Sequence, residues 1–459
     1  MPEPVPAVPD PWGERLPRKL GFWSAVAVVA GSTIGSGIFR TPAVVASRLP
    51  HLSVFVSGWV LGAVLALAGA LTYAELAAMY PRTGGIYVYI REAFGRAPAF
   101  LFGWAELWLI RPAALGAVSI VSAEYFWRLI GRDGGASFAV GMSVAQATAV
   151  LFIIIIGTVN YRGVQLGAIV QNASTVFKVG ALALLILLGF VLTPNPDAIP
   201  PMPPASALTT LSPVSAFGLA LVSILWAYDG FADLGFVSGE VKDPQRVLPR
   251  ALIAGTALVA LVYLGANAVY LHLVTLERMP GSPLVAADAA AMILGRAGVV
   301  FVSAAVMVST FGTLNGSTMT GPRVFYAMAE DGLFFKKLGV VHPRFGTPSA
   351  AIVLAATLGV LFVSVRQFAE LADQFIIGIW PFYALAVAAV FVLRRRLPNA
   401  QRPYRTWGYP MVPGLFLLAA LFILGNYMIS EPRTFLWDVG LVLVGLPVFW
   451  LWERRSRTS

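Results

Sequence analysis

The sequence is dominated by long apolar runs, and such runs leave a chain few ways to fold. Of the 459 residues, 58% are hydrophobic and only 12% are charged, whereas soluble domains carry about 25% charged residues. Inside a bilayer no water satisfies the backbone, so a spanning segment must be a helix or part of a closed barrel. Runs of about 20 apolar residues match the length of a spanning helix. The sequence therefore predicts an all-α polytopic membrane protein.

Twelve apolar segments are long enough to be predicted as transmembrane helices. They cover residues 21–46, 53–79, 97–127, 137–158, 166–192, 213–240, 250–274, 298–329, 348–365, 370–393, 411–429 and 435–452.

The positive charge is distributed unevenly over this topology. The formal net charge is +10, and most of the 32 Lys and Arg lie in the segments on the N-terminal side of the predicted membrane. Because cytoplasmic loops carry an excess of Lys and Arg, we expect both termini to be cytoplasmic and the protein to lie in the cell membrane. An anionic leaflet attracts such charge, so membrane lipid rather than nucleic acid is the expected partner.

Residues that could hold a metal or form a covalent link are scarce. The chain contains no cysteine and three histidines, which lie near predicted loops or helix ends. We therefore expect no metal, no cofactor, no disulfide and no catalytic residues, and the chain is not expected to be an enzyme.

The first predicted helix is interrupted at its centre. Residues Gly31–Gly37 hold three glycines and three hydroxyl residues in seven positions. Glycine costs up to about 1 kcal/mol in a helix interior, and an opened backbone in a bilayer costs several kcal/mol per amide unless protein or water receives it. Such a break exposes N–H and C=O groups to a small charged ligand. The alternative is a packing face, because Gly31 and Gly35 have the GxxxG spacing.

A second interruption lies in the sixth predicted helix, at Trp226–Gly230, with a further acid at Asp233. Breaks in the first and sixth helices are typical of a five-helix unit repeated with inverted topology, and the pair favours a binding site over a packing face. The predicted organisation is a cytoplasmic N-terminus 1–20, a first repeat 21–192, an external loop 193–212, a second repeat 213–393, a basic cytoplasmic loop 394–410, two extra helices 411–452 and a cytoplasmic C-terminus 453–459.

Three ionisable residues lie deep in predicted helices, where charges normally find a partner or face a cavity. Glu106 and Arg111 are five residues apart, about 140° round a regular helix, so we expect each to pair elsewhere, with a role in a permeation pathway as the alternative. Lys178 could tie down a broken helix, replace a bound cation such as sodium, or shuttle a proton. The first two roles are compatible and are favoured.

Other polar residues allow two interpretations each. Asn315 and Ser317 in the eighth helix either pack closely against the first helix or line a path. Asp233 begins the second half of a broken helix, where the dipole favours a carboxylate, so a helix cap is the first interpretation. Asp229 either partners a buried cation such as Arg111 or faces a ligand.

Together these residues resemble the amino acid, polyamine and organocation transporter superfamily, and most of all its L-type amino acid transporters, which include light subunits of heteromeric transporters and bacterial relatives. The resemblance covers predicted helices one to eight in order. It implies an inverted five-plus-five repeat (LeuT-like) with discontinuous helices one and six, two extra helices, and sodium-independent exchange of amino acids. The matching pieces are Gly31–Phe39, Pro81–Tyr89, Trp104 with Glu106 and Arg111-Pro112, Gln171–Lys178, Ala227–Gly230 with Glu240, and Phe311–Ser317.

Residue by residue, the resemblance implies a site for an L-amino acid. The backbone of the first break would receive the carboxylate, and carbonyls of both breaks would receive the α-ammonium. Trp226 would be an aromatic gate, and Lys178 would replace sodium. Light subunits use a cysteine for linkage to a heavy subunit, and this chain has none, so we expect a monomer without that subunit. The implied binding residues are Thr33, Ile34, Gly35, Ser36, Gly37, Trp226, Ala227, Tyr228, Asp229 and Gly230.

The expected function is sodium-independent exchange of L-amino acids by alternating access, with neutral amino acids favoured. A proton-coupled symporter and a transporter of cationic or mixed amino acids remain alternatives. A protein that senses amino acids without transporting them is a further one.

Overall fold

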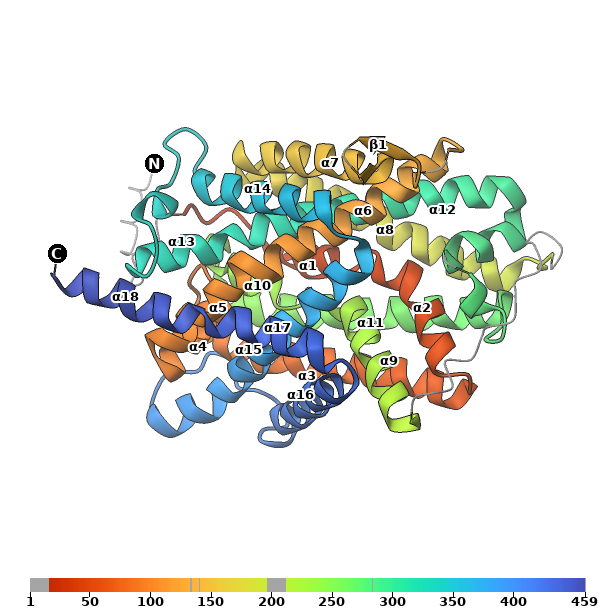
Figure 1. Ribbon diagram of the computed structural model, residues 1–459. Helices are drawn as coiled ribbons and strands as arrows, with labels where there is room; N and C mark the ends of the chain where they lie inside the picture. The colour runs from red at the N-terminus through yellow and green to blue at the C-terminus, as the bar shows by residue number, and fades with distance from the viewer. Residues whose placement is uncertain (1–15, 133, 140, 196–211, 283, 459) are drawn as a thin grey trace, which may run out of the picture.

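The computed structural model describes residues 16–132, 134–139, 141–195, 212–282 and 284–458, and most of them are helical (Figure 1). Within these residues, ten helical segments are long and apolar enough to cross a membrane, and α9 and α14 are shorter apolar helices. The chain is therefore a multi-pass membrane protein. Most of the predicted 193–212 loop and of the 1–20 segment lies outside the described residues.

The elements follow one another as a series of helices with one small hairpin of strands. In chain order they are α1 (Phe22–Thr33), α2 (Gly37–Arg48), α3 (Leu52–Met79), α4 (Ile86–Phe94), α5 (Arg96–Ala105), the π-helical turn η1 (Glu106–Ile110), α6 (Arg111–Leu129), β1 (Ser137–Ala139), β2 (Met142–Ser143), α7 (Val144–Tyr161), α8 (Val164–Val191), α9 (Pro213–Tyr228), α10 (Asp233–Phe236), η3 (Ser238–Glu240), α11 (Pro244–Leu273), η4 (Met279–Gly281), α12 (Val285–Thr320), α13 (Pro322–Glu330), η5 (Lys336–Gly339), α14 (Ser349–Val365), α15 (Phe368–Arg396), α16 (Met411–Ser430), α17 (Pro432–Leu443) and α18 (Gly445–Thr458).

The short helix α1 lies inside the bundle. It packs against α8, α11 and α12, while α6 packs against α7, α12, α14 and α15. Nine of the twelve residues of α1 are buried. In Figure 1, α4, α13 and the end of α18 lie at the left end of the bundle, and α1 lies near its middle. The interruption after α1 is therefore enclosed by protein, as an opened backbone in a membrane requires.

The predicted helix 137–158 begins later than expected. The segments Ser137–Ala139 and Met142–Ser143 form the antiparallel pair β1 and β2, and α7 starts at Val144. The reason is a capping box: the Ser143 hydroxyl accepts from the Gln146 N–H at 3.1 Å, and the Gln146 side chain accepts from the Ser143 N–H at 2.8 Å. This reciprocal pair satisfies two orphan donors and fixes the start of the helix.

Two other predicted helices also have different limits. The segment predicted at 298–329 starts earlier, at Val285, and bends at Gly295, where φ is +55°. It ends at Thr320, and α13 follows. The segment predicted at 435–452 is divided into α17 and α18. Apolar composition predicts that these helices exist, but it does not predict where they begin, bend or end.

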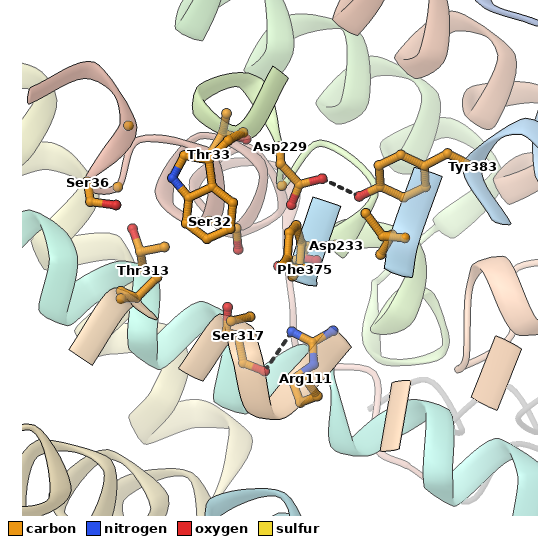
Figure 2. A pocket seen from close by; sticks show the side chains of 17 residues that line it. Ser32, Thr33, Ser36, Arg111, Asp229, Asp233, Thr313, Ser317, Phe375 and Tyr383 are labelled. Carbon is orange, nitrogen blue, oxygen red and sulfur yellow. Dashed lines mark hydrogen bonds between the residues drawn. The ribbon is translucent and has the colours of Figure 1, made fainter. Parts of the chain in front are cut away.

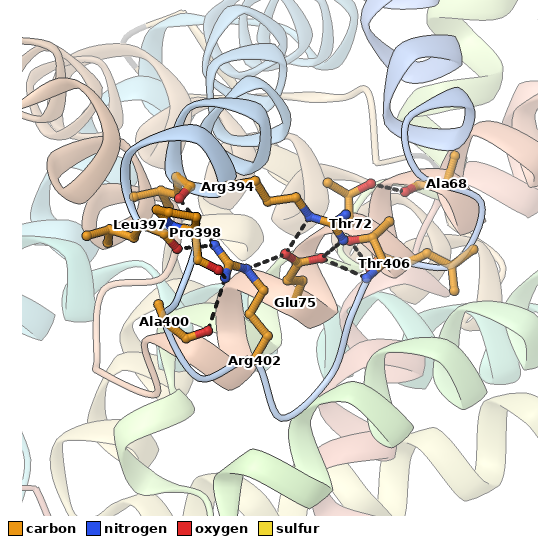
Figure 3. Close-up of polar contacts among 11 residues, drawn as sticks. Ala68, Thr72, Glu75, Arg394, Leu397, Pro398, Ala400, Arg402 and Thr406 are labelled. Atoms are coloured by element: carbon orange, nitrogen blue, oxygen red, sulfur yellow. Dashed lines mark hydrogen bonds and ion pairs between the residues drawn. The ribbon is translucent and has the colours of Figure 1, made fainter.

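A buried carboxylate connects α3 to α15 and to the basic loop that follows it (Figure 3). Glu75 is 1% exposed and accepts from Arg394 Nε at 3.0 Å and Nη2 at 2.6 Å. It also accepts from the Thr406 N–H at 2.7 Å, and Arg402 Nε lies 3.2 Å away. Arg402 further donates to the carbonyls of Leu393, Leu397 and Ala400. One carboxylate thus fixes two helices and the loop.

A second buried pair, separate from this cluster, connects α13 to η3. Arg323 of α13 donates to Glu240 through Nε at 2.9 Å, and both side chains are almost fully buried. The Glu240 carbonyl also accepts from the N–H groups of Lys19 and Leu20. The segment before α1 is therefore attached to η3.

We expect Glu75→Gln to destabilise the fold, because it leaves two arginines without their counter-ion. Removing one partner of a buried pair costs about 3–5 kcal/mol. The thermal unfolding temperature of the purified protein measures this. Glu277→Gln, at an exposed loop position, is the control and should leave the temperature unchanged. Equal shifts in the two variants would contradict the role given to Glu75.

Candidate binding site

The first predicted break is present. Helix α1 ends at Thr33 and α2 begins at Gly37, and the residues between them are not helical. No side chain caps the N-terminus of α2, so its first N–H groups depend on other acceptors. Together with the positive end of the helix dipole, these donors favour an anion.

The second predicted break is also present, and it touches the first. Helix α9 ends at Tyr228 and α10 begins at Asp233. Gly230 has φ +118°, and a Cβ there would lie 2.7 Å from the Thr33 nitrogen. A Cβ on Gly37 would lie 2.5 Å from the Ala227 Cα. Glycine is therefore required for the close approach of the two backbones.

A tyrosine that the sequence did not single out joins the two breaks. Tyr263 of α11 donates its hydroxyl to the Thr33 carbonyl at 2.9 Å and to the Ala227 carbonyl at 3.0 Å. Both carbonyls belong to the set expected to receive an α-ammonium, so a ligand would share them with Tyr263. A lone tyrosine in an apolar helix carries no local signal of such a role.

Lys178 of α8 holds the first break from the other side. Its Nζ donates to the carbonyls of Gly31 at 2.9 Å, Ile34 at 2.6 Å and Ser309 at 2.9 Å, and lies 3.2 Å from the Thr313 hydroxyl. The side chain is fully buried. A buried ammonium is tolerated when all its donors are used, and here they connect the break to α12.

The polar residues of α12 divide into two groups. Asn315 donates to the Gly167 carbonyl and to Gln171, both at 3.0 Å, and accepts from Asn160 at 2.9 Å. It therefore packs α7, α8 and α12 together. Ser317 instead lines a cavity.

This cavity lies where the two breaks meet (Figure 2), and its empty volume, counting the part open to solvent, is about 530 Å³. The part that can hold the centre of a water molecule is about 40 Å³, well below the range of about 300–1,000 Å³ of small-molecule sites. Of the residues singled out from the sequence, ten line it, whereas Ile34, Ala227, Tyr228, Lys178 and Asn315 do not. The lining residues are Ser32, Thr33, Gly35, Ser36, Gly37, Arg111, Ala114, Val118, Trp226, Asp229, Gly230, Asp233, Thr313, Ser317, Phe375, Ile379 and Tyr383.

The two aspartates of the cavity are held by hydroxyl groups. Tyr383 of α15 donates to Asp229 at 2.5 Å (Figure 2), and Thr320 donates to Asp233 at 3.2 Å. As for the two interpretations of Asp229, its side chain lines the cavity, and the alternative partner Arg111 pairs with Glu106. Asp233 is the first residue of α10, as expected, but its side chain makes no capping hydrogen bond and accepts from Thr320 of α12 instead.

Arg111 pairs with Glu106, against the expectation that each would find a partner elsewhere. Arg111 Nη2 lies 2.8 Å from Glu106 Oε1. The expectation assumed a regular α-helix, but η1 is π-helical and the Arg111 N–H donates to the Glu106 carbonyl. A turn closed from residue i to i+5 brings these two side chains to one face.

Trp226 separates this cavity from a second one. Its ring lines both, and the second cavity also contains Arg40 and Phe368. Trp226 meets Phe375 edge-on at 5.1 Å and Phe368 at 6.3 Å. Arg40 lies 4.4 Å from the centre of the Phe368 ring and pairs with Glu124 at 3.0 Å.

Residues 20–450 match the family model described as amino acid permease. The chain belongs to the amino acid permease family. This family consists of transporters rather than enzymes, and the match confirms the resemblance to the amino acid, polyamine and organocation superfamily.

Several curated permeases are similar over nearly their whole length. The serine/threonine exchanger SteT of Bacillus subtilis (strain 168) is 32% identical, over 96% of this chain and 98% of that protein. The Homo sapiens b(0,+)-type amino acid transporter 1 is 32% identical, over 96% and 89%. The Homo sapiens cystine/glutamate transporter is 29% identical, over 96% and 87%.

The contact between the two breaks predicts that adding a methyl group at Gly37 lowers the stability of the protein. We expect Gly37→Ala to destabilise the protein by about 1–3 kcal/mol, the usual cost of overpacking, because the new Cβ meets backbone. Thermal unfolding measures it. The matched control is Gly425→Ala in α16, where a Cβ meets nothing within 4 Å, and this variant should be as stable as the parent. If Gly37→Ala unfolds at the same temperature as the parent, the close contact between Gly37 and Ala227 is contradicted. If Gly425→Ala is destabilised as well, a lower unfolding temperature of Gly37→Ala does not report on the contact between the two breaks.

Proposed function

We propose that this permease is an L-amino acid exchanger that works by alternating access around the two broken helices, without sodium, and favours neutral amino acids. The supporting observation is a cavity lined by both breaks, with an uncapped helix N-terminus on one side and carboxylates on the other. A zwitterion needs this combination of opposite charges. SteT, which is similar along the whole chain, is an exchanger by its name.

In this proposal, the first break binds the carboxylate and the second binds the ammonium. The N–H groups of Ser36 and Gly37, at the start of α2, suit an anion. Carbonyls of the Trp226–Gly230 segment, together with Asp229, suit the α-ammonium. Trp226 covers the substrate and separates it from the second cavity.

The observation that carries sodium independence is the position of Lys178. A sodium ion that bridged the first break and α12 would be coordinated by oxygens. Here the Lys178 ammonium occupies that place, with three carbonyls within 2.9 Å. A fixed positive charge therefore does the structural work of the ion.

The rest of the proposal concerns the whole molecule. The ten spanning segments and the two shorter apolar helices support twelve transmembrane helices arranged as an inverted five-plus-five repeat with two added helices. The distribution of Lys and Arg supports cytoplasmic termini in the cell membrane. The chain has no cysteine, so it would work as a monomer without a disulfide-linked heavy subunit.

Counterflow in proteoliposomes tests exchange and its ion dependence together. We expect uptake of labelled serine or alanine to require unlabelled amino acid inside, and to be unchanged when choline replaces sodium, because Lys178 already supplies the charge. Empty vesicles are the control. A sodium requirement would contradict the role of Lys178. Net accumulation driven by a pH gradient would support a proton-coupled symporter, and binding without any uptake would support a sensor.

Transport of cationic amino acids is a second candidate, because Asp229 lines the cavity and only one of its oxygens is bonded to Tyr383 in the described structure. The apolar neighbours Trp226, Phe375 and Ile379 favour neutral side chains instead.

Uptake of alanine, leucine and arginine by the parent and by Asp229→Asn separates these candidates. We expect alanine or leucine to be transported better than arginine by the parent protein. Any arginine uptake should fall by about tenfold or more in Asp229→Asn, since an unpaired charge in a desolvated site is heavily penalised. If arginine is the best substrate of the parent and is selectively lost in the variant, the neutral preference is wrong.

A further inference from the structure

Arg111 is the one Lys or Arg among the described residues that line the central cavity. A guanidinium presents paired donors that match a carboxylate. In the absence of competing partners, Arg111 would bind the side chain of an acidic amino acid such as glutamate.

Two donor groups of Arg111 are engaged by protein partners, whereas its buried Nε has no hydrogen-bond partner among the described residues. Nη2 lies 2.8 Å from Glu106 and Nη1 donates to the Ser317 carbonyl at 3.3 Å, and Figure 2 places this guanidinium beside Ser317 at the edge of the cavity. Its Cζ lies 5.9 Å from the centre of the Phe236 ring. The Arg111 stem packs on Gly321, where a Cβ would lie 2.0 Å from Nε. The group is therefore held in one position.

The charges around Arg111 are acidic in excess. Glu106 is 0% exposed behind the guanidinium and does not line the cavity, whereas Asp233 is 7% exposed and does. Asp233 interacts electrostatically with Arg111. Arg111 compensates one of these two carboxylates, so an incoming carboxylate would meet a group with a net charge of −1. Like charges at short range in a site that excludes water cost several kcal/mol.

We propose that Glu106 and Asp233 are specificity-determining residues: they offset the positive charge of Arg111 and so exclude amino acids with acidic side chains. Glu106 acts by positioning and neutralising Arg111, and Asp233 also by repelling the ligand from within the cavity. Neutral side chains are not affected by this arrangement. The inference rests on the proposed binding of amino acids in this cavity.

The test compares L-glutamate with L-glutamine, which have nearly the same shape and differ in charge. Competition against a labelled neutral amino acid on the purified protein gives the affinity of each ligand. In the parent, we expect glutamine to bind at least about tenfold more tightly than glutamate. In Glu106→Gln the ratio should shift toward glutamate by about tenfold, and further in the double variant Glu106→Gln, Asp233→Asn, because Arg111 is then uncompensated.

Two controls separate this effect from general damage. Glu240→Gln also removes a fully buried carboxylate from an arginine, Arg323, but away from the cavity, so the glutamate-to-glutamine ratio should not change. Adding Arg111→Gln to Glu106→Gln should return the ratio to that of the parent, since the cation that binds the acidic side chain is gone.

The outcomes are distinct. A ratio unchanged in both Glu106→Gln and the double variant would overturn the inference, as would a parent protein that binds glutamate as well as glutamine. If Glu106→Gln does not fold, Asp233→Asn alone is compared with the parent. Its amide oxygen can still accept the hydrogen bond from the Thr320 hydroxyl, while the negative charge is lost. If the parent binds no amino acid at all, the proposed function fails instead, and that result is seen before any variant is made.

Discussion

One ammonium group makes the interrupted first helix possible. The carbonyls of Gly31 and Ile34 lie at the break, and each unsatisfied backbone group inside a membrane costs several kcal/mol. Lys178 donates to both, and a third bond to Ser309 fixes the break against α12. Since the shape of the cavity depends on where α1 ends and α2 begins, the geometry of the cavity depends on this lysine. The ammonium belongs to the chain itself, unlike a bound ion.

The buried carboxylates follow two rules. Away from the cavity, Glu75 and Glu240 are paired with arginines and connect helices to loops. At the cavity, Asp229 and Asp233 are held by hydroxyls of Tyr383 and Thr320, which orient a carboxylate without neutralising it. The two aspartates that line the cavity thus have hydroxyl partners, whereas Glu75 and Glu240 are in ion pairs with arginines.

The sequence predicted both breaks because their causes are local: glycines that permit close approach, and hydroxyl or acidic residues next to them. The sequence could not predict the role of Tyr263, which depends on a contact between helices distant in sequence.

The pairing of Glu106 with Arg111 was also missed. A π-helical turn changes which residues share a face, and no residue in that turn signals it. The late start of α7 was readable, since Ser143 and Gln146 have the spacing of a capping box. The extent of α12 was not, because apolar composition does not mark where a helix bends. The sequence also could not predict that Asn315 lies outside the cavity, because that depends on how α7 and α8 pack against α12.

The hydroxyl of Tyr263 has one hydrogen, which it shares between a carbonyl in the first break and a carbonyl in the second. If the two breaks moved apart, at least one of these carbonyls would lose the Tyr263 hydroxyl as its donor. The same separation would open a gap where Gly37 lies against Ala227. Tyr263 of α11 therefore couples α1 to α9, because a motion that separates these two helices has to break at least one of its two hydrogen bonds.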